Sequence, residues 1–141
     1  MTVERLAELI QLFAERSPIA RYFGMKLSFS TDNESTIDLD YNPNLDHSMG
    51  AIHGGVYATM LDIAGWFASA AMHDISSWVA TSQMSIHFLE AARQTSLQAR
   101  GRVIKSGKRL DVAEMDLYDG HGILVGRATG TYIVLPKISM A

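Results

Sequence analysis

The sequence predicts an α+β fold in which a curved antiparallel sheet of about six strands wraps around one long central helix. One observation is the apolar stretch over residues 54–72, which contains a single charged side chain and predicts a buried helix. The other is a series of strand-like segments joined by short polar or glycine-containing links, which favour antiparallel neighbours. With 141 residues and 48% hydrophobic content, we expect one domain over 1–141.

The chain opens with a helical segment, residues 1–23. Apolar residues recur along it at helical spacing: Val3, Leu6, Leu9, Ile10 and Phe13. This predicts an amphipathic helix that ends near Ser17 and Pro18, and a short helical turn before Gly24. The segment is charged and has no continuous apolar core before a cleavage site, so we interpret it as structure and not as a signal peptide.

Rough alternation of apolar and polar residues predicts the strands. Two of them, over 25–32 and 36–41, are joined by a turn and precede a loop over 42–50. The others follow the central helix, over 78–89, 95–104, 109–118 and 123–135. Such a sheet has edge strands and an uncovered side that need protection, so we expect the chain to self-associate.

Composition argues against several classes of function. The net charge is −3 and the basic residues are scattered, so nucleic acid is not expected as a partner. The chain contains no cysteine, which removes disulfides, thiolate metal sites and thiol nucleophiles and fits a cytoplasmic protein. The stretch over 54–72 is nearly long enough to span a bilayer, but Asp62 near its middle and the lack of a basic flank favour burial in protein over a membrane.

The segment from His47 to Gly55 joins a polar loop to the start of the predicted central helix. Glycines at a helix N-terminus let a ligand approach the backbone, and the free N–H groups there stabilise developing negative charge, as on a thioester carbonyl that becomes an oxyanion. Asp62 is the only charged side chain in this helix, and its burial without a partner would be costly. A structural hydrogen bond to a neighbouring strand is the ordinary explanation for one such aspartate.

Gly54 and Asp62 are eight residues apart, which at about 1.5 Å rise per residue separates their backbones by roughly 12 Å along one helix. One helix therefore cannot bring both residues to the same carbonyl carbon. If both act on it, the glycine comes from one subunit and the aspartate from another. A homo-oligomer with its active site at the subunit interface is the expected arrangement.

Several motifs together resemble the phenylacetate-degradation (PaaI-like) branch of the hotdog-fold thioesterases. They are G-x-x-H-G-G at Gly50, His53, Gly54 and Gly55; Leu61-Asp62 with Ala64 and Ala68; the segment from Thr81 to Leu89; Ser106-Gly107-Lys108; and Gly130-Thr131-Tyr132. The resemblance covers most of the chain after about residue 18 and implies a hotdog fold that hydrolyses an acyl-CoA thioester to a free acid and coenzyme A.

The resemblance also implies roles for five residues. Asp62 matches the acidic residue that serves as nucleophile or general base, and Gly54 the glycine whose N–H polarises the carbonyl. Thr81 matches a hydroxyl that places the carboxylate or water, and His53 a histidine that shapes the helix start. His47 stands where relatives commonly have Asn or Gln to orient water or substrate, and an exposed loop histidine is the alternative explanation.

Relatives bind the phosphates of coenzyme A at the subunit surface, which makes four cations candidate contacts: Arg93, Lys105, Lys108 and Arg109. Charged hairpins of this kind are otherwise simply solvated. Because His47 and His53 have no third ligand nearby, no metal is expected, and the resemblance implies no redox cofactor. A dimer and a tetramer both remain open, and so do two other functions, a hydratase or dehydratase of the same fold and a non-catalytic acyl-CoA-binding sensor.

Overall fold

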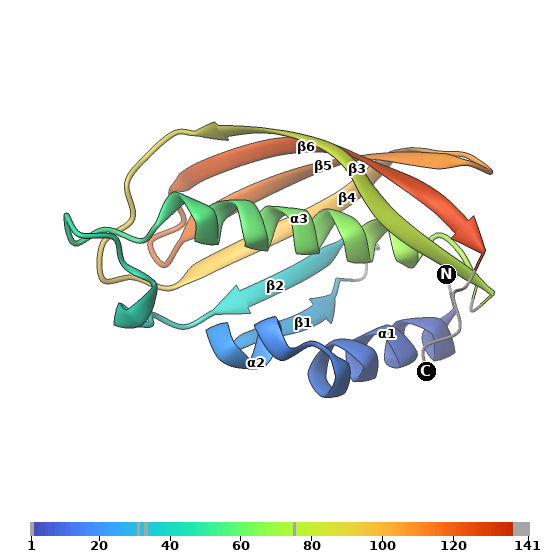
Figure 1. The fold of residues 1–141 in the computed structure, drawn as a ribbon, viewed down its shortest axis with the longest axis horizontal. Coiled ribbons are helices and arrows are strands. Elements are labelled where there is room, and N and C mark those ends of the chain that lie inside the picture. Colours follow the sequence, from blue (N-terminus) through green and yellow to red (C-terminus); the bar gives the residue numbers. More distant parts are fainter. Residues whose placement is uncertain (1, 31, 33, 75, 137–141) are drawn as a thin grey trace.

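The computed structural model describes residues 2–30, 32, 34–74 and 76–136, and its central element is the helix α3, Gly54–Ala70. A six-stranded antiparallel sheet curves around this helix (Figure 1). In chain order its strands are β1 (Met25–Phe29), β2 (Ser35–Leu39), β3 (Ser77–Phe88), β4 (Leu97–Ser106), β5 (Leu110–Asp119) and β6 (Leu124–Pro136). They lie in the order β1-β2-β4-β5-β6-β3, which confirms the predicted α+β hotdog arrangement.

Two N-terminal helices pack beside α3, near the β1 edge of the sheet (Figure 1). In α1, Val3–Arg16, Leu9 and Phe13 are buried, and the ring of Phe13 meets that of Phe67 of α3 edge to face at 5.2 Å. A second helix, α2 (Pro18–Phe23), ends at Gly24, whose φ of 88° is the left-handed conformation that favours glycine. Both helices begin and end close to the predicted positions.

Close contact with the sheet fixes the position of α3. Gly101 of β4 lies against the helix so tightly that a Cβ there would overlap the carbonyl of Ala64. The buried hydroxyl of Ser35 donates to the same carbonyl oxygen at 2.5 Å. Met60, Leu61 and Ala64 are fully buried as a result, and this side of the helix forms the centre of the core.

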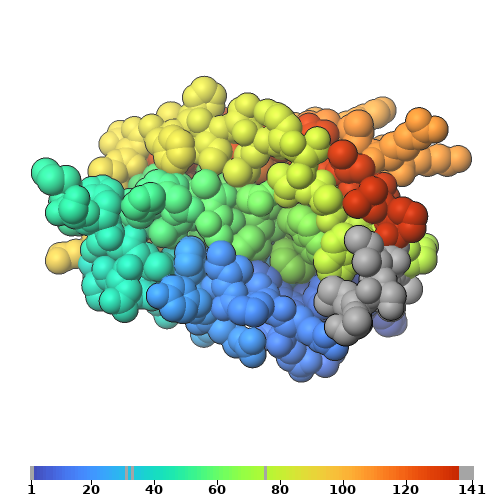
Figure 2. Space-filling view, viewed as in Figure 1, coloured from blue at the N-terminus to red at the C-terminus, as the bar shows by residue number. Residues whose placement is uncertain are grey.

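One face of α3 is not covered by the chain's own sheet. Residues that are not buried recur every three or four positions along it: Gly55, Ala58, Thr59, Asp62, Ile63 and Trp66. Figure 2 shows this part of the helix between the N-terminal helices, in blue, and the yellow segment that leads from β3 to β4. The predicted burial of this helix therefore holds where the sheet and the N-terminal helix α1 cover it, but not along this stripe.

The edge strand β3 is long and largely exposed. Among the described residues it pairs with β6 alone, and the register of that pairing shifts between Thr81 and Gln83. Such a bulge re-aims the side chains around it. None of the helices in the described part of the chain is long and apolar enough to cross a membrane.

The loop between β2 and α3 contains one turn of 3-10 helix, η1 (Pro43–Leu45). Asn42 caps it by accepting a hydrogen bond from the N–H of Asn44 at 3.0 Å. An isolated β-bridge between Asp46 and Ile52 then closes the rest of the loop on itself. The closed loop therefore fixes the position and direction of the backbone where α3 begins.

Candidate active site

Asp62 lies on the uncovered face of α3 and is held by the edge strand. The hydroxyl of Thr81 donates to Oδ1 of Asp62 at 2.8 Å. Thr81 stands immediately before the bulge in β3, so the strand's irregularity and its contact with the helix occur at the same place. The structure therefore brings together the predicted carboxylate and the predicted hydroxyl.

Tyr132 of β6 is a second partner of Asp62, and no role was predicted for it. Its fully buried hydroxyl lies 3.3 Å from Oδ1 of Asp62 and 3.2 Å from the carbonyl oxygen of the same residue. A Cβ at Gly65 would overlap this hydroxyl, so the glycine one turn after Asp62 makes room for the phenol. An isolated glycine within a strongly apolar helix was the signal that something approaches closely there.

The environment of Tyr132 keeps its hydroxyl protonated. Burial raises the pKa of this phenol well above its ordinary value of 10.0, and the negative charge of Asp62 raises it further. The hydroxyl therefore remains a hydrogen-bond donor at any pH near neutrality. Thr81 and Tyr132 both donate hydrogen bonds to Oδ1 of Asp62, whereas Oδ2 accepts none from the residues that the structure describes.

The start of α3 presents a free backbone donor. His53 caps the helix, and its Nδ1 accepts the N–H of Gly55 at 2.7 Å. The N–H of Gly54 has no acceptor within the described residues. The ring of Phe88 lies beside it, 3.3 Å from where a Cβ would stand. Gly54 thus offers an unused N–H at the positive end of the helix, and His53 shapes that end.

His47 lies near this helix start. Its Nδ1 accepts the N–H of Met49 at 3.0 Å, so the ring proton is on Nε2 and the neutral imidazole can still donate one hydrogen bond. His47 and Gly54 line the same cavity of about 260 Å³, together with Tyr57 and Phe88. Within the described ranges, no three or more potential metal-binding side chains gather in one place.

The two halves of the predicted site lie apart within one chain. Gly54 and His47 line one cavity, whereas Asp62 lines another, of about 370 Å³, between α3, the N-terminal helices and β3. Among the residues that the structure describes, none lines both cavities. Because α3 is a continuous helix, the separation of roughly 12 Å expected from its rise per residue applies.

The four candidate cations are divided between two places. Arg93 donates to the carbonyl oxygen of Met49 at 3.0 Å and so braces the loop that precedes α3. Lys105, Lys108 and Arg109 belong to the β4–β5 hairpin, which lies at the opposite end of the molecule from that loop (Figure 1). Resemblance alone did not reveal this separation.

The hairpin is fixed by a buried aspartate that the sequence did not single out. Oδ1 of Asp111 accepts the hydroxyl of Ser106 at 2.7 Å and the N–H of Gly107 at 3.2 Å. Its Oδ2 accepts the hydroxyl of Ser69 at 2.6 Å and lies 2.7 Å from Nε2 of His73. The Ser106-Gly107 turn is therefore anchored to the C-terminal end of α3.

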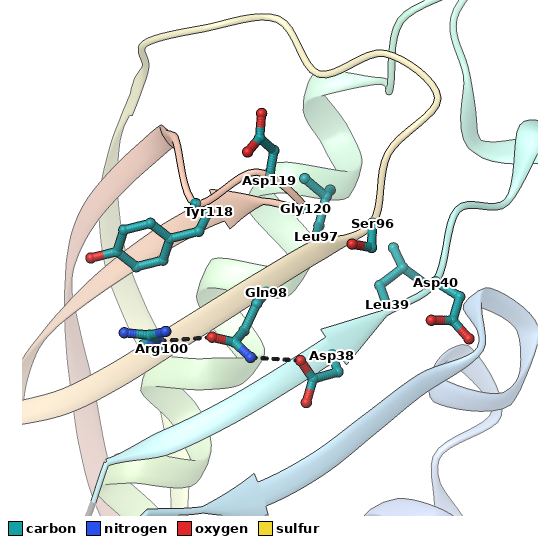
Figure 3. Close-up of a pocket in the computed structure, with 11 residues that line it drawn as sticks. Asp38, Leu39, Asp40, Ser96, Leu97, Gln98, Arg100, Tyr118, Asp119 and Gly120 are labelled. Carbon is teal, nitrogen blue, oxygen red and sulfur yellow. Dashed lines mark hydrogen bonds between the residues drawn. The ribbon is translucent and has the colours of Figure 1, made fainter.

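A larger cavity, of about 580 Å³, lies on the face of the sheet that points away from α3 (Figure 3). There Gln98 donates to Asp38 at 2.8 Å and accepts from Arg100 at 2.8 Å, and the guanidinium of Arg100 lies over the ring of Tyr118. None of the predicted catalytic residues lines it.

Comparison with known proteins identifies the family. Residues 49–125 match the model of the thioesterase superfamily. A Saccharolobus solfataricus protein provisionally named as an esterase is 28% identical, over 95% of this chain and 86% of its own length. YigI of Escherichia coli, named as a medium/long-chain acyl-CoA thioesterase, is 22% identical over 95% of this chain and 97% of its own. The structure of a Bacillus halodurans protein with CoA superposes with a TM-score of 0.80 at 23% identity, covering 96% of this chain and 92% of that chain. Because the family model matches more than half of this chain, the chain belongs to the thioesterase superfamily.

Proposed function

We propose that the protein is an acyl-CoA thioesterase that hydrolyses its substrate to a free acid and coenzyme A. One observation carries the proposal: Thr81 and Tyr132 both bond Oδ1 of Asp62, which leaves Oδ2 available on the open face of α3. A carboxylate used only as a structural anchor has no need of a free oxygen facing a cavity. The same arrangement suits a nucleophile or a general base.

The chemistry follows from this geometry in one of two ways. As a nucleophile, Oδ2 attacks the thioester carbon, the C–S bond breaks, coenzyme A leaves as a thiolate that takes up a proton, and water then hydrolyses the mixed anhydride. As a general base, Oδ2 takes a proton from a water molecule that attacks the same carbon; the C–S bond then breaks, and the proton passes to the coenzyme A thiolate that leaves. In both cases the carbonyl oxygen becomes negative and is stabilised by the N–H of Gly54 at the positive end of α3.

The histidines near the helix start have positioning roles in this proposal. His53 accepts the N–H of Gly55 and holds the helix start in place, which leaves the N–H of Gly54 free to donate to the substrate. The neutral ring of His47 donates from Nε2 to water or to the thioester, the task of the Asn or Gln amide in relatives. Neither residue transfers a proton.

Two subunits form each active site, with Gly54 from one and Asp62 from the other. Three features support this assembly: the roughly 12 Å between these residues along α3, the separate cavities that they line, and the uncovered stripe on α3 that includes Asp62. The long exposed edge strand β3 supplies a further surface for a second copy. The assembly is a homodimer or a homotetramer.

The named relatives support a coenzyme A thioester as the substrate. YigI is named for acyl-CoA hydrolysis, and the Bacillus halodurans structure contains CoA. We propose Arg93 and the hairpin cations Lys105, Lys108 and Arg109 as phosphate contacts that come together only in the assembly. We also propose that the chain belongs to the phenylacetate-degradation branch, which the motif from Gly50 to Gly55 resembles.

Thiol release from a panel of aromatic and aliphatic acyl-CoAs tests the proposal, with the wild type and Asp62→Asn measured side by side. The wild type is expected to release thiol, and the variant to lose activity while remaining folded and oligomeric. Binding of acyl-CoA without release from any member would instead identify a non-catalytic acyl-CoA-binding protein. The presence of His47 in place of an amide is the feature that makes this alternative worth testing.

A further inference from the structure

We infer that the cavity between the N-terminal helices and α3 receives the acyl group of the substrate, and that the protein selects an apolar acyl group without a charge at its far end. The inference rests on the proposed thioesterase function and extends it to the substrate class. Asp62 itself lies in the wall of this cavity, so an acyl chain that enters it keeps its thioester carbon beside the carboxylate.

The cavity has the size and the lining of an apolar subsite. Its volume of about 370 Å³ lies near the lower end of the range for ligand pockets, which suits an acyl group while coenzyme A remains outside. Apolar side chains come from four elements, with α1 and α2 on one side and α3 and β3 on the other: Leu12, Phe13, Ile19, Ile63, Trp66 and Trp78.

Aromatic rings form a continuous wall. Trp66 meets Trp78 edge to face with centroids 5.1 Å apart, and it meets Phe67 at 4.8 Å. The indole N–H of Trp66 donates to the carbonyl oxygen of Val79 at 2.9 Å, so its polar end is already bonded. The ring faces that remain are apolar, and they stabilise hydrocarbon or aryl groups.

The distribution of charge supports an uncharged acyl group. Apart from Asp62, the one charged side chain among the described residues that line the cavity is Arg16, which is exposed to solvent. A carboxylate at the far end of the acyl group would lose its hydration without a buried counter-charge to replace it. The N-terminal helices lie outside residues 49–125, the part that matches the family model, and they supply one side of this cavity.

Fluorescence provides a test that does not depend on turnover, because the only two tryptophans of the sequence, Trp66 and Trp78, both line this cavity. Asp62→Asn is saturated with acyl-CoAs that carry a bromine at the far end of the acyl chain, since bromine quenches tryptophan on close approach. Unbrominated acyl-CoAs of equal length and free coenzyme A are the controls. Loss of fluorescence with the brominated chains alone is expected; equal fluorescence in all samples would overturn the inference.

A pair of variants tests selectivity. Ile63→Phe fills the cavity, whereas Ile123→Phe makes the same change at an exposed turn that does not line it. For Ile63→Phe, kcat/KM with the longest substrates should fall at least about tenfold relative to the shortest, with no such change for Ile123→Phe. If both variants keep the wild-type chain-length profile, the inference is wrong even though the enzyme is a thioesterase. If no acyl-CoA is hydrolysed at all, the proposed function fails, and the quenching experiment still decides whether the cavity holds the acyl group.

Discussion

Thr81 of the edge strand β3 holds the carboxylate of Asp62 on the central helix, with its hydroxyl 2.8 Å from Oδ1. Thr81→Val keeps the side-chain shape and removes the donor. Because a hydrogen bond to a charged group contributes about 1.5–3 kcal/mol, we expect kcat to fall about 10- to 100-fold with little change in KM. Steady-state kinetics of thiol release measures this effect.

Thr129→Val is the matched control for this substitution, because Thr129 is exposed on β6 and its hydroxyl forms no hydrogen bond with the residues that the structure describes. Its activity should remain within about twofold of the wild type, since surface substitutions usually change little. Equal kcat values for Thr81→Val and Thr129→Val would show that Thr81 does not position the carboxylate.

Gly54 permits a direct test of its backbone donor. It is the first residue of α3, where proline is well tolerated, and His53 before it has φ of −61° and ψ of 138°, as a residue preceding proline requires. Gly54→Pro therefore removes the N–H while keeping the helix. We expect kcat to fall about 10²- to 10³-fold, the usual cost of losing one oxyanion donor.

Gly54→Ala separates the lost N–H from added bulk. The new Cβ would stand 3.3 Å from the ring of Phe88, an exposed side chain that can shift, and the N–H is retained. This variant should keep far more activity than Gly54→Pro. Similar losses in the two variants would mean that space beside Phe88, and not the N–H, is what the reaction requires.

Ionisation of Tyr132 predicts a stability effect at high pH. Its folded-state pKa lies above the ordinary value of 10.0, chiefly through burial, so the unfolded chain loses this proton first. Above about pH 10 the free energy of unfolding of the wild type should therefore fall faster than that of Tyr132→Phe, by about 1.4 kcal/mol per pH unit. Burial also raises the pKa of Tyr57. Because Tyr57 is present in both proteins, its contribution cancels when the two are compared. Urea denaturation from pH 8 to 11 measures the difference, and parallel curves would contradict it.

Asp111 should matter for stability. Replacing it with alanine leaves the buried hydroxyl of Ser69 and the hydroxyl of Ser106 without their acceptor and releases the β4–β5 hairpin from α3. We expect Asp111→Ala to lower the free energy of unfolding by about 3–5 kcal/mol in urea denaturation. Asp40→Ala, at an exposed position, should change it by less than about 0.5 kcal/mol. A loss below about 1 kcal/mol for Asp111→Ala would show that the network is dispensable.

Local patterns were sufficient to predict the elements of this fold. The apolar run that begins at Gly54 and the alternating segments around short turns correspond to α3 and the six strands, with ends that differ by a few residues. These signals act over neighbouring residues, where helix and strand periodicity is strong. The separation of Gly54 from Asp62 was predictable for the same reason, because both belong to one helix.

Contacts between distant segments were not predictable in the same way. Tyr132 approaches Asp62 across 70 residues, and Asp111 meets Ser69 across 42. Periodicity indicates that Tyr132 faces inward but not which residue it meets. The cavity beside Asp62 likewise depends on how α1 and α2 dock on α3, which no local motif specifies.

An oligomer of mixed subunits can show whether Gly54 and Asp62 act across the interface. Asp62→Asn and Gly54→Pro chains, each expected to be nearly inactive alone, are co-expressed with different tags, and the assembly that carries both is purified. A mixed dimer then has one site with both wild-type residues and one with neither, so thiol release of about half the wild-type rate per dimer is predicted. A mixed oligomer as inactive as its two parents would contradict a site shared between subunits.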